Sequence, residues 1–132
     1  MCEQNWDDGL PNGEYEIPPR TKCEKHPISD FVPCDIEYLR IQGNRWTQAG
    51  RLTEFVFVLQ LRNENTGRWQ NHLSIDCTHS NAHIHHYKDG ERDGRARETI
   101  KVLNSARDVQ DALGMAILRV RREINKLAEV QK

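Results

Sequence analysis

The feature that most restricts the fold is the segment from Thr53 to Leu61, in which the largest apolar side chains occupy every second position and Val56, Val58 and Gln60 lie between them. Every second residue over 55–61 is large and apolar, so these side chains share one side of an extended chain. A period of two is typical of a strand with one buried face, and it does not fit a helix. We therefore predict a central β-strand over residues 53–61.

Three further segments alternate in the same way, at 69–77, 82–88 and 97–103. They are separated by turn formers, including residues 63–67 and two Asp-Gly pairs within 89–94. Short turns of this kind join successive antiparallel strands. The pattern predicts an antiparallel β-meander of three to four strands.

The C-terminal part carries a helical pattern. Ser105, followed three positions later by Asp108, predicts a helix cap. The apolar residues that then recur with a period of 3.6 are Val109, Ala112, Leu113, Ala116, Ile117, Val120, Ile124 and Leu127. We predict one amphipathic helix covering one sheet face, which makes residues 51–132 an α+β domain and one folding unit.

The first 50 residues lack the regular periodicity of the rest of the chain. All five prolines lie within residues 11–33, which excludes a long helix or a central strand there. We predict an irregular arm and loop over residues 1–50, with a short edge strand at 36–41 and a polar loop at 42–50. At 132 residues the chain is the size of one domain.

Composition restricts the function classes. The 19 basic and 20 acidic residues nearly cancel, which argues against a protein that coats phosphates through net positive charge. The longest apolar run, over 55–59, is far shorter than the roughly 20 residues of a membrane span. The first residues lack a signal-peptide pattern, so we expect a cytoplasmic protein with its four cysteines as thiols.

The most unusual feature is a cluster of histidines. Five of the six lie within fifteen residues, at His72, His79, His83, His85 and His86. If Leu73, Ile75 and Ile84 face the helix, alternation places a polar set on the opposite face. That set is His72, Ser74, Asp76, His83, His85 and Tyr87.

A four-residue loop at 78–81 would also set the register of the two strands. The cross-strand pairs expected are Asp76 with His83, Ser74 with His85, and His72 with Tyr87. Side chains paired in this way lie close enough to act together.

Imidazoles titrate near neutrality, so two of them can serve as acid and base. We predict metal-independent cleavage of an RNA phosphodiester. The catalytic candidates are His83, His85, Asp76 and His79, and the substrate-binding candidates are His72, Tyr87, Arg95 and Arg97. Two alternatives stay open: the cluster holds zinc or another first-row metal, or it is a polar face of a non-enzymatic interaction module.

The order of these motifs resembles a known group. The shared order is an Arg-Trp strand, Asp-x-x-His, His-x-His, an Asp-Gly turn and a C-terminal helix. In this order the chain resembles small prokaryotic domains of unknown function, among them the TumE-like proteins of toxin–antitoxin operons. Asp76, His79, His83 and His85 match that pattern. The resemblance implies a cytoplasmic toxin that acts on RNA and binds a cognate antitoxin. Homodimerisation through an exposed sheet edge is a further expectation.

Overall fold

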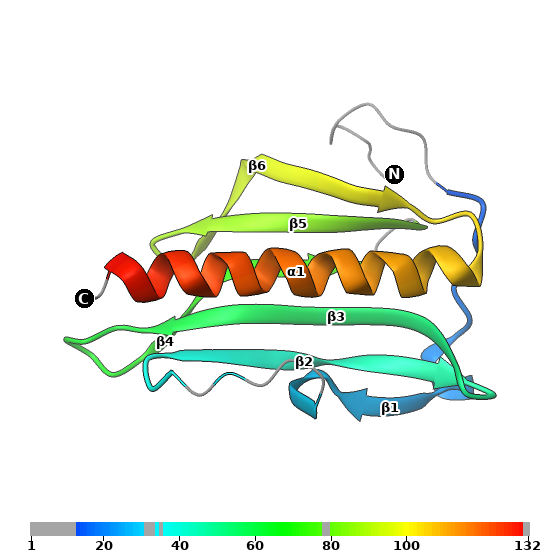
Figure 1. The fold of residues 1–132 in the computed structure, drawn as a ribbon, viewed down its shortest axis with the longest axis horizontal. Coiled ribbons are helices and arrows are strands. Elements are labelled where there is room, and N and C mark those ends of the chain that lie inside the picture. Colours follow the sequence, from blue (N-terminus) through cyan, green and yellow to red (C-terminus); the bar gives the residue numbers. More distant parts are fainter. Residues whose placement is uncertain (1–12, 31–33, 35, 78–79, 131–132) are drawn as a thin grey trace.

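The computed structural model describes residues 13–30, 34, 36–77 and 80–130. Figure 1 shows one antiparallel sheet of six strands and one long helix, with the strands in chain order from β1 to β6. The elements are η1 (Arg20–Lys22), β1 (Glu24–Pro27), η2 (Ile28–Asp30), β2 (Leu39–Gln48), β3 (Arg51–Arg62), β4 (Trp69–Asp76), β5 (Asn81–Lys88), β6 (Glu91–Val102) and α1 (Ala106–Val130). The α+β class and the antiparallel meander are confirmed.

The sheet has more strands than the three to four predicted, and the two additional strands lie before residue 50. The predicted loop at 42–50 is wrong, because β2 continues to Gln48. The short edge strand predicted at 36–41 is present from Leu39 onward as the start of the longer β2, and residues 39–41 pair with β3 alone, since β1 pairs with residues 44–47. The pattern did not reveal the rest of β2 because Gly43, opposite Phe57, interrupts the apolar series of Leu39 and Ile41.

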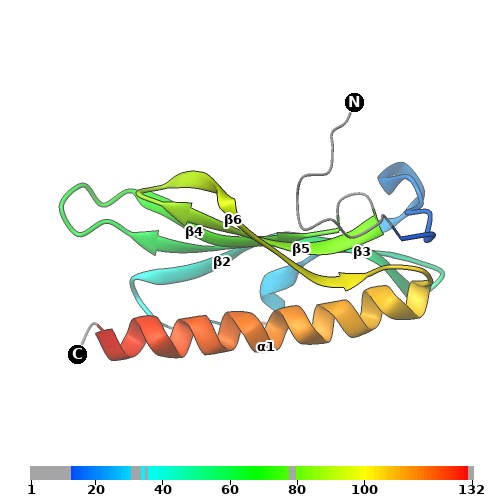
Figure 2. The same cartoon turned by 90° about the horizontal axis from the view of Figure 1, so that it is seen from above.

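The helix α1 lies along one face of the sheet (Figure 2). Its buried residues, such as Val109 and Val120, pack with Phe57, Leu73 and Ile75 of the sheet into one apolar cluster. This is the core that the two periodicities predicted. Among the described residues no α-helix covers the opposite side, which we call the open face. The short helix η1 packs against one end of it, where the guanidinium of Arg20 lies 4.0 Å from the centre of the Trp46 ring.

The predicted cap is present at the start of α1. The backbone N–H of Asp108 donates to the Ser105 hydroxyl (3.4 Å), and its carboxylate accepts from the N–H of Asn104 (2.8 Å). In the part of the chain that the structure describes, α1 is the one long helix, and it is too polar to cross a membrane.

The arm before β1 is irregular, as predicted, but it is attached to the sheet. The N–H of Tyr15 donates to the carbonyl of Leu103 (3.0 Å), and its hydroxyl donates to the carbonyl of Thr53 (3.0 Å). Arg20 then binds Glu54 through two hydrogen bonds of 3.0 and 3.1 Å. These contacts hold the arm against one end of the sheet.

Candidate functional site on the open face

The register of β4 and β5 brings the predicted site residues together. Asp76 lies opposite His83, and Ser74 lies opposite His85, as expected. Both pairs stand on the open face, since the residues between them, such as Ile75, are buried in the core under α1. The central part of the predicted site is therefore assembled by the sheet.

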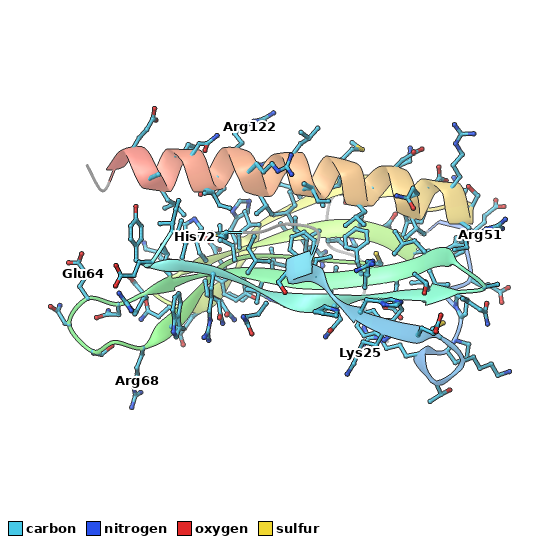
Figure 3. All side chains as sticks on the ribbon, turned by 60° about the horizontal axis from the view of Figure 1, so that its bottom comes forward. Lys25, Arg51, Glu64, Arg68, His72 and Arg122 are labelled. Atoms are coloured by element: carbon cyan, nitrogen blue, oxygen red, sulfur yellow. The ribbon has the colours of Figure 1, made fainter. Side chains whose placement is uncertain are left out.

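His72 is an exception, and its predicted place opposite Tyr87 is wrong. The β3–β4 register shifts here: Leu59 pairs with Leu73 but Gln60 pairs with Asn71, so His72 is an extra residue in β4. This bulge turns His72 toward the helix (Figure 3), where its Nε2 lies 2.7 Å from the Glu123 carboxylate. His72 cannot bind a substrate on the open face from this position.

His86 also points to the helix side. Its Nε2 lies 2.6 Å from Glu98, and Arg119 of α1 binds the same carboxylate through two hydrogen bonds of 2.9 and 2.8 Å. The bonds from Arg119 and His86 hold the pKa of Glu98 at about 2, although partial burial acts in the opposite direction. Burial likewise raises the pKa of Glu123, but the hydrogen bond from His72 and nearby positive charges leave it below its usual value.

The two remaining described histidines of the cluster form a buried group on the open face. Nε2 of His85 lies 3.3 Å from the Asp76 carboxylate, and the rings of His83 and His85 are 6.0 Å apart between centroids. His83 is 2% exposed and His85 is 7% exposed. Asp76 lines a neighbouring cavity, whereas neither imidazole does, so Asp76 is the more accessible group.

A cavity of about 280 Å³ opens next to this group. It is lined by Gln42, Gly43, Val56, Phe57, Val58, Ser74, Asp76, Tyr87 and Arg92. The hydroxyls of Ser74 and Tyr87 share a hydrogen bond of 3.1 Å, and Nη2 of Arg92 lies 3.5 Å from the same Tyr87 oxygen. A carboxylate, two hydroxyls and a guanidinium thus converge on one apolar floor.

Gly43 is required where β2 passes this floor. Its φ is +145°, and a Cβ built there would lie 2.2 Å from the carbonyl oxygen of Val56. A side chain at this position would push the two strands apart. Glycine therefore sets the close approach of the strands beneath the cavity.

The other predicted site residues lie away from the cavity or beyond the described part. Arg97 stands opposite His85 on β6, half-buried, and does not line the cavity. The backbone of Arg95 belongs to β6, but its side chain and the whole of His79 lie outside what the structure describes. Gln42 and Arg92 also line the cavity but were not predicted, since neither belongs to the alternating segments of the histidine hairpin.

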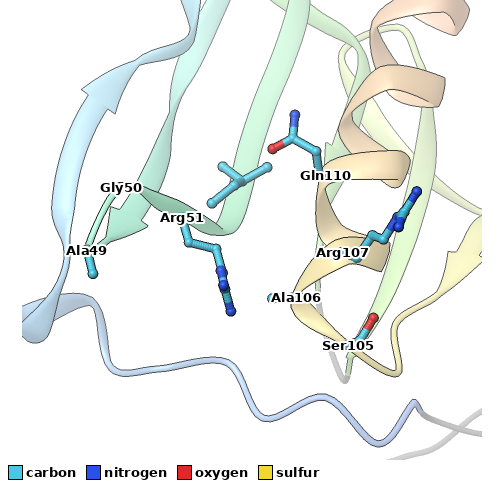
Figure 4. Close-up of a pocket in the computed structure, with 8 residues that line it drawn as sticks. Ala49, Gly50, Arg51, Ser105, Ala106, Arg107 and Gln110 are labelled. Carbon is cyan, nitrogen blue, oxygen red and sulfur yellow. The ribbon is translucent and has the colours of Figure 1, made fainter.

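A second cavity of about 640 Å³ lies between the β2–β3 turn and the start of α1 (Figure 4). Arg51 and Arg107 stand at its walls, and both are exposed. At the helix end beside them, Ser105 and Asp108 are already engaged in the hydrogen bonds of the cap. This cavity has cations but no buried polar group aimed into it among its described lining residues, so it is a weaker candidate.

The described residues do not form a metal site. Within them, no three His, Cys, Asp or Glu side chains group closely enough to hold a metal ion. Cys23, Cys34 and Cys77 are free thiols, and burial raises the pKa of Cys77 to about 12, so it stays protonated and inert near neutrality. The described residues therefore give no support to the alternative that the histidine cluster binds zinc.

The open face therefore offers one site with convergent polar groups, centred on Asp76 and His85. The resemblance to TumE-like proteins remains a prediction that rests on the motif residues. Comparisons of the chain with models of known protein families, with curated proteins and with solved structures gave no match.

Proposed function

We propose that this protein is a toxin-like enzyme that cleaves RNA phosphodiester bonds without a metal ion. The observation that carries the proposal is the cavity where Asp76, held by His85, meets Tyr87 and Arg92. An acid, a base and a cation in one pocket are the groups that this reaction requires.

The cavity has the chemistry to hold one nucleotide. Its volume of about 280 Å³ is close to the lower end of ligand pockets, roughly 300–1,000 Å³. Arg92 supplies a positive charge for a phosphate, and Gln42 and Ser74 supply hydrogen-bonding groups for a base or a sugar. The apolar side chains of Val56 and Val58 offer a surface for a flat base.

The proposed reaction is an attack by the 2′-hydroxyl on the neighbouring phosphorus. A bond forms from the 2′ oxygen to phosphorus while the bond to the 5′ oxygen breaks, which leaves a 2′,3′-cyclic phosphate and a 5′-hydroxyl. Asp76 takes the proton of the 2′-hydroxyl, and Tyr87 gives its proton to the departing 5′ oxygen. Arg92 stabilises the phosphate and the phenolate, and solvent then returns the proton from Asp76 to Tyr87.

In this scheme the buried imidazoles are positioning residues. His85 orients the Asp76 carboxylate at 3.3 Å, and His83 packs behind it with its ring 6.0 Å away. This differs from the sequence-based hypothesis, in which His83 and His85 exchange protons with the substrate themselves. The change follows from their burial.

The test is incubation of a single-stranded RNA with wild-type protein and Asp76→Asn in the presence of a chelator, with the product ends identified by mass spectrometry. We expect wild type to yield cyclic phosphate ends and Asp76→Asn to be slower by about 100-fold or more, because the base is lost. Tyr87→Phe should also be slower.

His86→Gln is the matched control, since His86 neighbours His85 in the chain but binds Glu98 on the helix side. Its cleavage rate should equal that of wild type. Equal rates for wild type and Asp76→Asn, or a loss of cleavage with the chelator, would contradict the proposal. Intact RNA in every sample would favour the non-enzymatic interaction module.

A further inference from the structure

A second group of side chains on the open face lies next to the cavity and has no role in the proposed reaction. It consists of Arg40, Arg62 and Trp69, which we call the arginine–tryptophan cluster. The guanidinium of Arg40 lies 4.3 Å from the centre of the Trp69 ring, and that of Arg62 lies 5.9 Å from it. Arg40 comes from β2 and Trp69 from β4, so Arg40 reaches across β3 to make this contact.

The cluster is held in place by side-chain hydrogen bonds. Nε of Arg40 donates to Oε1 of Gln60 (2.7 Å), and Nε2 of Gln60 donates to Oδ1 of Asn71 (2.8 Å). Three neighbouring strands thus contribute to one hydrogen-bonded group of side chains. A guanidinium stacked on an indole in a fixed position loses less side-chain entropy when a flat ligand binds to it.

The cluster adjoins the catalytic cavity. On β2, Arg40 comes two residues before Gln42, and on β3, Gln60 comes two residues after Val58. Two strand residues span about 7 Å. Since Gln42 and Val58 line the cavity, the cluster lies beside it along these strands, and we call the two together the track.

The charge on this end of the track is positive. Arg62 and Arg68 are exposed, and Figure 3 shows Arg68 pointing away from the side of α1, whereas Glu64 of the same hairpin points toward it. Arg62 forms an ion pair of 3.5 Å with Glu37, but Glu37 is 85% exposed, so a phosphate can displace it at little cost. The chain carries a net charge of only −1, which makes the cationic patch a local feature.

We propose that the arginine–tryptophan cluster, together with Arg68, binds single-stranded RNA and leads it into the cavity. This inference rests on the proposed function, because it names the form of RNA that the site takes. Unpaired bases expose flat faces that stack on tryptophan and on arginine planes, whereas bases in a duplex are covered by their neighbours. The phosphates of the same strand pair with Arg62, Arg68 and Arg92.

The test measures binding separately from cleavage. A fluorescein-labelled 2′-O-methyl oligouridine has no free 2′-hydroxyl, so it binds without being cleaved, and its anisotropy reports binding. Trp69→Leu keeps apolar bulk but removes the aromatic face, and we expect about tenfold weaker binding. Trp69→Phe should bind like wild type, and Arg62→Ala should lower the slope of log affinity against log salt by about one.

Arg122→Ala is the charge-matched control, because Arg122 lies on α1 on the far side from the open face (Figure 3). It should leave the affinity unchanged. The proposal is overturned if wild type does not bind the oligouridine, if Trp69→Leu binds as tightly as wild type while remaining folded, or if a duplex of equal length binds more tightly. An acidic peptide that binds instead of the oligonucleotide would assign the cluster to a protein partner.

The two proposals fail separately. Oligouridine binding that depends on Trp69, without any cleavage of RNA, would support the track and contradict the enzyme. Cleavage of RNA that is unaffected by Trp69→Leu, with unchanged oligouridine binding, would do the reverse.

Discussion

Both faces of the sheet carry histidines, carboxylates and arginines, but these side chains have different partners on each face. Under α1, His72 and His86 are each bound to a carboxylate, and Arg119 completes the pairing of Glu98. On the open face, the carboxylate of Asp76 and the guanidinium of Arg92 line a cavity. The helix side uses its charges to join two layers, whereas the two charged groups of the open face border a cavity.

The difference shows that a dense run of histidines need not form one site. Strand alternation and one bulge divide the described members of the cluster equally, with two on each side of the sheet. Only the pair beside Asp76 stands near a cavity. Substitutions on the two faces should therefore change the free energy of unfolding by different amounts.

The largest effect is expected from the core under α1. Phe57→Ala should lower the free energy of unfolding by about 3–5 kcal/mol, because the side chain is fully buried and leaves a cavity. Val58→Ala, one residue further and half-buried on the open face, should cost less than about 1 kcal/mol. Urea denaturation monitored by circular dichroism measures both, and equal losses would show that the open face is packed like a core.

A smaller effect is expected at Gly43, where β2 and β3 approach each other. Gly43→Ala should cost roughly 1–3 kcal/mol for its backbone conformation, with a further loss from the contact to Val56. It should also slow RNA cleavage, since the floor of the cavity would shift. Gly50→Ala is the control: its φ is +77° but a Cβ there meets nothing within 4 Å. Equal losses at Gly43 and Gly50 would mean that the close approach has no energetic role.

The smallest effect concerns the charges under α1 and depends on pH. The pKa of Glu98 falls from 4.5 to about 2 on folding. Because the folded-state pKa is the lower one, the ionised carboxylate stabilises the fold above about pH 4.5, and this stabilisation disappears as the pH falls toward 2. Glu98→Gln should therefore unfold at a lower urea concentration than wild type at pH 7.

The same comparison near pH 2 should show little difference between Glu98→Gln and wild type. Glu64→Gln, in the exposed β3–β4 hairpin, is a control that should change the midpoint little at either pH. A destabilisation by Glu98→Gln that persists unchanged at pH 2 would show that the side chain acts through packing and not through its charge.

Much of the fold follows from local periodicity. The alternation over 53–61 predicted β3, and the 3.6-residue stripe after Ser105 predicted α1, because each pattern depends only on neighbours in the chain. The register of Asp76 with His83 also followed, since one short connection sets it. β1 and the part of β2 beyond residue 41 were not predicted, because prolines and Gly43 interrupt any period.

The sequence alone therefore specified the order of four strands and a helix, and the face that Asp76 and His85 share. Tertiary structure decided the rest of the site: the bulge that turns His72 toward Glu123 depends on how β4 meets β3. The approach of Arg40 to Trp69 likewise joins residues from two strands that are not sequence neighbours. Local patterns encode which side a residue faces, but only the packed partner strands determine what it meets there.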